Sequence, residues 1–369
     1  MTRLRLTALA RSLPATVPFV GPETQERQRG RPFRARIGAN ENGFGASPRV
    51  AAAISAAAPD MWKYCDPENH DLRGLIAAHH GVAPDNVAVG EGIDGLLGLV
   101  VRLFVEPGQP VVTSLGAYPT FNYHVAGFGG RLVTAPYRDD REDIEALLDA
   151  VRSEDAPLVY LANPDNPMGT WWEGGEIRRF IEGLPETTLL VLDEAYSEMA
   201  PASALPPLDV SRPNVVRMRT FSKAYGLAGM RCGYAIGEAE VIRAFDKVRN
   251  HFGVGRMAQA ACAAAILDQD WLSEVLDRIA DGRRRIAGIA ADNGLAALPS
   301  ATNFVTVDCG GDGAHAMKVM QGLIARDVFV RKPMAPGLDR CIRIGVGPDD
   351  ELDVLAEELP GAIAAARGS

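Results

Sequence analysis

Short apolar runs alternate with amphipathic stretches along most of this chain. Seven of the runs are almost entirely apolar, which is the pattern of strands that are buried on both faces of a sheet. Helical patterns stand between them, for example at 93–105 and 142–151. This alternation predicts an α/β domain with a mainly parallel, seven-stranded sheet between helices. The expected strands are 86–90, 110–114, 131–137, 157–164, 187–196, 214–222 and 231–237.

The pattern changes towards the C-terminus. A long helical zone from about 257 to 293 is followed by a helix near 314–326, a final helix and three further apolar runs. These runs, which we expect to be strands, are 303–308, 328–332 and 341–347. Residues 1 to about 38 are rich in Pro, Arg and Gly and have no core-forming pattern. We therefore expect an N-terminal arm (1–38), a large domain (39–256) and a smaller α+β C-terminal domain (257–369).

Composition excludes several classes of protein. The 369 residues are 47% hydrophobic and 23% charged, and their net charge is −9, with no basic stripe of the kind that binds nucleic acid. No run reaches the roughly 20 apolar residues of a membrane span. The start of the chain lacks an apolar core, so no signal peptide is expected. The five scattered cysteines and the histidines have no metal-ligand spacing, which predicts no metal site and a reducing, cytoplasmic location.

Polar residues at the ends of the predicted strands are the candidates for chemistry, because ligands of open α/β sheets bind there. Asp193 ends the apolar run 187–196, and Lys223 follows the run 214–222 among small residues. These two side chains could simply form an ion pair. They could also face pyridoxal 5′-phosphate (PLP), which needs a lysine for a Schiff base and an acid that keeps a proton on its ring nitrogen.

Two further motifs lie at strand ends. The segment 163–169 (NPDNPMG) is typical of a turn, but its Asn166 and the nearby Tyr196 could both bond the phenolic oxygen of PLP. The segment 90–95 (GEGIDG) matches the glycine pattern of dinucleotide sites. The next strand does not end in the acid that such a site needs, so we expect a helix N-terminus that binds another phosphate.

Taken in order, these motifs resemble the fold-type-I PLP-dependent aminotransferases, and among them most closely the histidinol-phosphate aminotransferases. The resemblance spans about residues 36–360. It implies that Lys223 forms the Schiff base, that Asp193 pairs with the pyridine nitrogen, and that Asn166 and Tyr196 bond the ring oxygen. The motifs that carry it are NEN (40–42), YxDP (64–67), GxD (92–94), AYP (117–119), NPxNPxG (163–169), DEAY (193–196), SKAYGLAGxRxGY (222–234) and RIGVG (343–347).

The resemblance assigns roles to the other site residues as well. Tyr118 is expected to stack on the cofactor ring. Tyr64 is expected to reach the phosphate in a neighbouring subunit, which implies a homodimer. Burial and the charge of Arg231 are expected to lower the pKa of Lys223. The residues expected around the phosphate are Gly92, Ile93, Asp94, Thr220, Ser222 and Arg231.

The substrate side of the site is less fully specified. Arg343 is expected to bind the substrate α-carboxylate through its guanidinium fork, with Asn40 beside it and Arg331 near the far end of the substrate. Histidinol phosphate with 2-oxoglutarate is the expected pair. Phe19 stands where the family commonly has a phosphate-binding tyrosine. An aromatic amino acid aminotransferase and a threonine-phosphate decarboxylase therefore stay open as alternatives.

Overall fold

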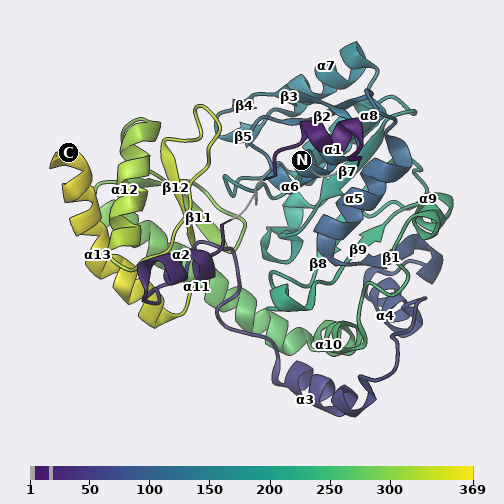
Figure 1. Cartoon of the computed structure of the whole chain (residues 1–369), viewed down its shortest axis with the longest axis horizontal. Helices are drawn as coiled ribbons and strands as arrows, with labels where there is room; N and C mark the ends of the chain where they lie inside the picture. The colour runs from purple at the N-terminus through teal and green to yellow at the C-terminus, as the bar shows by residue number, and fades with distance from the viewer. Residues whose placement is uncertain (1–4, 16–19, 369) are drawn as a thin grey trace.

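The computed structural model describes residues 5–15 and 20–368, and in this part of the chain a seven-stranded sheet forms the centre of the larger lobe (Figure 1). The strands follow the order β1-β9-β8-β7-β6-β2-β3. Only β9 runs opposite to the other six strands, so the predicted mainly parallel sheet is confirmed. The strands are β1 (Val87–Gly90), β2 (Pro110–Ser114), β3 (Arg131–Ala135), β6 (Leu158–Ala162), β7 (Leu189–Asp193), β8 (Val215–Thr220) and β9 (Gly233–Ile236).

Helices cover both faces of this sheet, because its central strands are apolar on both sides. Successive side chains of a strand point to opposite faces. Tyr160 therefore packs in a core with α5 and α6, whereas its neighbours Val159 and Leu161 pack in a core with α7 and α8. The helices of this lobe are α3 (Pro48–Ala57), α4 (His70–His80), α5 (Gly92–Phe104), α6 (Pro119–Gly127), α7 (Ile144–Glu154), α8 (Gly174–Gly183), α9 (Ala239–Ala244) and α10 (Arg256–Ile266).

A second, smaller lobe lies beside the large one (Figure 1). Its antiparallel sheet consists of β10 (Ala296–Ala297), β11 (Phe304–Asp308) and β12 (Cys341–Gly345). The helices around it are α11 (Gln269–Asp292), α12 (Gly313–Ala325) and α13 (Asp349–Gly368). The proposed domain boundary at 256/257 falls at the start of α10, a helix that packs against α3 and α4 of the large lobe.

The described part of the N-terminal arm contains two short helices, α1 (Ala8–Ser12) and α2 (Pro22–Arg29). From the end of α2 onward the arm is held on the small lobe by ion pairs: Arg29 binds Asp327, and Arg34 binds Glu357 and Glu358 of α13 at 2.7 and 2.9 Å. A short hairpin of β4 (Tyr137–Arg138) and β5 (Arg141–Glu142) projects from the large sheet.

The expected strand at 328–332 is wrong. Val328 forms only an isolated bridge with Ala35 of the arm, and Arg331 forms another with Arg343 of β12. Because each bridge is made with a different segment, no continuous ladder develops. Pro333, which has no N–H to donate, then prevents the ladder from extending towards the C-terminus. The segment instead connects the arm to the small sheet and, as described below, forms one wall of a cavity.

Candidate active site

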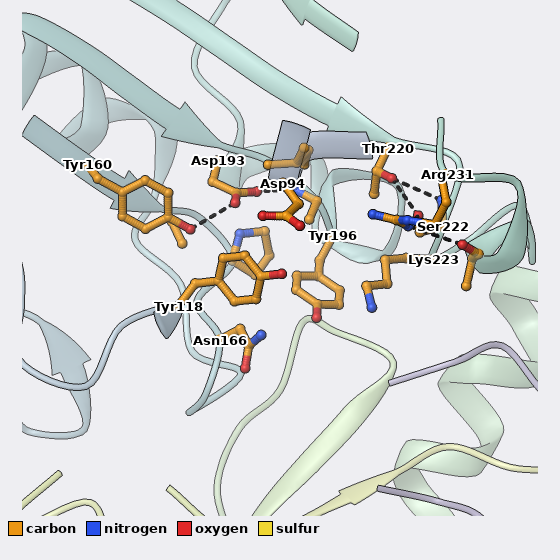
Figure 2. Close-up of a pocket in the computed structure, with 15 residues that line it drawn as sticks. Asp94, Tyr118, Tyr160, Asn166, Asp193, Tyr196, Thr220, Ser222, Lys223 and Arg231 are labelled. Carbon is orange, nitrogen blue, oxygen red and sulfur yellow. Dashed lines mark hydrogen bonds between the residues drawn. The ribbon is translucent and has the colours of Figure 1, made fainter. Parts of the chain in front are cut away.

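A cavity of about 130 Å³ lies at the carboxyl ends of β6, β7 and β8 and at the N-terminus of α5 (Figure 2). This is the edge at which open α/β sheets bind ligands. The structure therefore gathers ten of the predicted cofactor residues in one place. The predicted residues that line it are Ile93, Asp94, Tyr118, Asn166, Asp193, Tyr196, Thr220, Ser222, Lys223 and Arg231.

Lys223 lies in the loop after β8, and its amine projects into the cavity (Figure 2). Nζ donates a hydrogen bond to the backbone carbonyl of Asn40 at 3.1 Å and lies 5.8 Å from the centre of the Tyr196 ring. Burial, with the nearby charges of Arg343 and Arg231, lowers the pKa of Lys223 to about 8. Roughly a tenth of this amine is therefore unprotonated at pH 7 and able to attack a carbonyl group.

Asp193 ends β7 and is 5% exposed. Oδ2 accepts a hydrogen bond from the Tyr160 hydroxyl at 2.8 Å, and Oδ1 accepts one from the backbone N–H of Ala195 at 2.9 Å. Burial raises the pKa of Asp193 to about 6, so the carboxyl group is mainly ionised at neutral pH. Asp193 and Lys223 form no ion pair, which leaves both groups directed at the cavity.

An anion-binding cup forms the other end of this cavity. Arg231 Nη1 donates to Ser222 Oγ at 3.3 Å, and Thr220 Oγ1 lies 2.9 Å from the same Ser222 oxygen. The first N–H groups of α5 have no capping side chain. Gly92 has φ +75°, and a Cβ there would lie 2.6 Å from Arg231 Nη2. Only glycine at position 92 leaves this cup open. The hydroxyl, guanidinium and helix N-terminal donors of the cup fit a phosphate group.

A second cavity, of about 660 Å³, adjoins the first and shares Tyr118, Asn166 and Lys223 with it. Its walls come from the arm, from α12, from the segment 329–335 and from the large-lobe segments 116–122 and 166–167. The three predicted substrate residues Asn40, Arg331 and Arg343 all line it. Its charged lining residues are Lys223, Arg331, Lys332 and Arg343, and no carboxylate belongs to the described part of its lining.

Arg343 on β12 lines the second cavity and bonds Asn166, a residue that lines both cavities. Its Nη1 donates to Asn166 Oδ1 at 2.5 Å, its guanidinium lies 5.2 Å from the centre of the Phe304 ring, and its Nε is buried without a partner. Burial lowers the pKa of Arg343 to about 10. A buried, incompletely bonded guanidinium is suited to an anionic group of the substrate.

Asn40 and Arg331 flank this arginine. Asn40 is 4% exposed, has φ +56° and donates from Nδ2 to Tyr196 Oη at 3.1 Å, while its Oδ1 has no partner. Arg331 exchanges backbone hydrogen bonds with Arg343, and its Nη2 donates to the Val20 carbonyl of the arm at 3.0 Å. The arm and the small lobe thus close this cavity together.

The structure does not bring every predicted residue into the cavities. Tyr64 is 80% exposed, lines neither cavity and packs on Phe252 with a ring-centre distance of 5.0 Å. Asp94 lines the first cavity, but its Oδ1 pairs with His124 Nε2 at 2.8 Å. Phe19 lies outside the described residues.

Sequence reasoning missed Tyr160 and Asp165. Tyr160 is a single hydroxyl in the fully buried run 158–162, and such a group needs a partner, which was the available signal. Asp165 holds the loop that carries Asn166: its carboxylate accepts from Tyr137 Oη at 2.8 Å and from the Met168 N–H at 3.0 Å. Burial raises the pKa of Asp165 to about 6.

A lysine beyond a strand end, an acid on the adjacent strand and an anion cup beside them define a PLP-dependent enzyme of fold type I. The pattern of the family described as aminotransferase class I and II matches residues 36–359. The chain therefore belongs to the class I and II aminotransferases, and the predicted fold, enzyme class and PLP cofactor are confirmed.

Known relatives share most of the chain. Histidinol-phosphate aminotransferase 2 of Carboxydothermus hydrogenoformans is 36% identical over 90% of this chain and 91% of its own. The histidinol-phosphate aminotransferase of Anaeromyxobacter sp. is 38% identical over 91% and 93%. A crystal structure of histidinol-phosphate aminotransferase from Sinorhizobium meliloti with pyridoxal-5′-phosphate is 60% identical, covers 98% of each chain and superposes with a TM-score of 0.95.

The described residues contain neither a membrane-spanning helix nor a metal-binding cluster. None of the helices there combines the length and apolar character that crossing a bilayer requires. No group of three or more His, Cys, Asp or Glu residues in that part of the chain is arranged to hold a metal ion.

Proposed function

We propose that this enzyme transfers the amino group of histidinol phosphate to 2-oxoglutarate, a step of histidine biosynthesis. The observation that carries this proposal is the second cavity, whose charged lining residues are all cations. Histidinol phosphate is a phosphate monoester, and 2-oxoglutarate is a dicarboxylate, so both partners bring anions to the same arginines. Relatives that cover about nine-tenths of the chain carry the name of this activity.

Each step is assigned to a side chain of this chain. The cofactor supplies an aldehyde that condenses with amines and a ring that accepts the electron pair released at the substrate Cα. Arg343 binds the substrate anion, which orients the Cα–H bond for removal. Nζ of Lys223 takes up that proton and later returns it two bonds away, on the far side of the substrate nitrogen. The Asp193 carboxylate keeps a proton on the ring nitrogen, and Tyr196 and Asn166 bond the ring oxygen.

Apolar side chains in the second cavity support an aromatic amino acid as the second candidate donor. Met320 and Ile324 of α12 line it together with Phe329, Val330 and Met334. These side chains could cover an aromatic ring as well as an imidazole ring.

A turnover assay with three donors tests the substrate. Histidinol phosphate, phenylalanine and tyrosine are each offered with 2-oxoglutarate, and glutamate formation is measured. We expect the highest kcat/KM with histidinol phosphate. Turnover of only the aromatic amino acids would reject it as the donor. Threonine phosphate is tested in a separate incubation. Release of carbon dioxide from it, without formation of glutamate, would instead identify a decarboxylase.

We further propose that the enzyme is a homodimer in the cytoplasm. The exposed side chains of Met61, Trp62, Tyr64 and Phe252 support a subunit interface at this end of the molecule. All five cysteines, each within the described residues, are unpaired thiols, which fits a reducing compartment.

In a dimer, Tyr64→Phe should weaken PLP binding although Tyr64 lines neither cavity of its own subunit. Sedimentation as a monomer with full activity would refute this arrangement.

A further inference from the structure

We propose that Tyr160 is a positioning residue, whose hydroxyl fixes the Asp193 carboxylate in the orientation that serves the cofactor ring. The proposal rests on the assignment of PLP to this cavity. It does not depend on which amino donor the enzyme uses.

The contact joins two adjacent strands at one side of the cavity (Figure 2). Tyr160 lies on β6 and Asp193 at the end of β7, where the register pairs Ala162 with Asp193. Tyr160 Oη donates to Oδ2 of Asp193 at 2.8 Å, and the Ala195 N–H donates to Oδ1 at 2.9 Å. Each carboxylate oxygen thus has one fixed hydrogen-bond donor. The carboxylate keeps free lone pairs that can accept a hydrogen bond from a third donor.

The tyrosine ring is itself held in place. Phe121 of α6 stacks on it with a centroid distance of 4.7 Å and an interplanar angle of 19°. Both rings are 0% exposed. Tyr118, the N-cap residue of the same helix, also lines the cavity. The hydroxyl therefore cannot swing away from Asp193 without disturbing this packing.

Charge explains why a hydroxyl is useful at this position. Burial disfavours the ionised form of Asp193, and no cation forms an ion pair with it among the described residues. Burial also raises the pKa of Tyr160, so its hydroxyl stays protonated and acts as the donor. A hydrogen bond donated to the carboxylate opposes the effect of burial and favours the ionised form that attracts a ring N–H⁺.

The test compares two ligands in two variants. Tyr160→Phe keeps the ring and its stacking and removes only the hydroxyl. Tyr234→Phe is the matched control: Tyr234 is 1% exposed, its hydroxyl pairs with His80 Nε2 at 2.9 Å, and it lines neither cavity. The dissociation constants of PLP and of its carbocyclic analogue, in which carbon replaces the ring nitrogen, are measured by equilibrium dialysis.

We expect Tyr160→Phe to weaken PLP binding about tenfold, the size of one hydrogen bond to a charged group, and to change binding of the analogue less than about twofold. Tyr234→Phe should change neither constant. Equal weakening of both ligands by Tyr160→Phe would show that the hydroxyl acts through packing, and unchanged binding of both would show that it has no role. Each of these results overturns the proposal.

The outcome is separate from that of the substrate assay. A protein that binds PLP but does not turn over histidinol phosphate would lose its proposed donor and keep this role for Tyr160. A wild-type protein with no affinity for PLP would refute the cofactor assignment and Tyr160's role together.

Discussion

The two adjoining cavities of this enzyme are built differently. The first, of about 130 Å³, is formed by strand ends and the N-terminus of α5, and its polar side chains already bond one another. The second, of about 660 Å³, lies between the large lobe, the arm and the small lobe, with walls from 116–122, α12, the segment 329–335 and β12. Among its described lining residues, three buried polar atoms have no hydrogen-bond partner: Asn40 Oδ1, Asn122 Oδ1 and Arg343 Nε.

This difference matches the two tasks of the site. Groups that serve a cofactor in every cycle gain from being fixed in advance, because no reorganisation is then needed during reaction. A cavity that must accept a donor and an acceptor in turn cannot satisfy its own polar groups, since each substrate must complete them. We therefore expect substitutions in the first cavity to change the chemistry and substitutions in the second to change substrate recognition.

Lys223→Ala should have the largest effect. Loss of both the nucleophile and the proton carrier should lower kcat by at least about 10⁴-fold and abolish the absorbance of the covalently bound cofactor near the visible edge. Stopped-flow and steady-state spectra measure both quantities. Lys318→Ala, on the exposed side of α12, is the control and should leave them unchanged. A Lys223→Ala protein with unaltered colour and turnover would contradict the assignment.

Asp193→Asn should have the second-largest effect on turnover. The amide keeps the shape of the carboxylate and can still accept from Tyr160, but it cannot balance a positive charge on the ring nitrogen. We expect kcat to fall about 10²- to 10³-fold, while KM for both substrates stays nearly constant. Initial rates over a range of donor and acceptor concentrations separate the two parameters. A change confined to KM would place Asp193 in substrate recognition instead.

The buried amine of Lys223 should also be visible in the stability of the cofactor-free protein. Its pKa falls from 10.5 to about 8 on folding, so between these values the unfolded chain binds more protons and the stability contribution of this group rises with pH. Lys223→Met removes this dependence. Its stability advantage over wild type should be largest below pH 8 and should shrink by about 3 kcal/mol towards pH 10.5.

Urea unfolding of both cofactor-free proteins at several pH values between 7 and 10.5 measures this difference. The comparison cancels the titration of groups that the two proteins share. A stability difference that is the same at every pH would show that the pKa of Lys223 is not lowered by folding.

Arg343→Lys tests whether the two cavities function separately. A lysine keeps the positive charge but loses the two-pronged hydrogen bonding and the bond to Asn166. We expect kcat/KM to fall about ten- to a hundredfold for donor and acceptor alike, mainly through KM. The dissociation constant of PLP should not change. If cofactor affinity fell as much as substrate affinity, the two cavities would not be functionally separate.

Much of the first cavity could be predicted from the sequence, because most of its residues are next to a recognisable strand end or glycine-rich turn. Lys223, Asp193, Asn166 and Arg231 are such residues, and the structure places them all on one cavity. The segment 328–332 shows the limit of this reasoning. Its apolar run predicts a strand, but its two neighbours, the distant arm and the nearby β12, each contribute only one bridge.

The sequence by itself determined the alternation of strands and helices and the chemical groups available at the strand ends, since both follow from local pattern and residue type. The tertiary structure decided which of these groups meet. Tyr160 reaches Asp193 because β6 and β7 are paired in one register, and Arg343 reaches Asn166 across 177 residues because the small lobe packs on the large one. Contacts of this kind depend on the packing of distant segments, which no local pattern encodes.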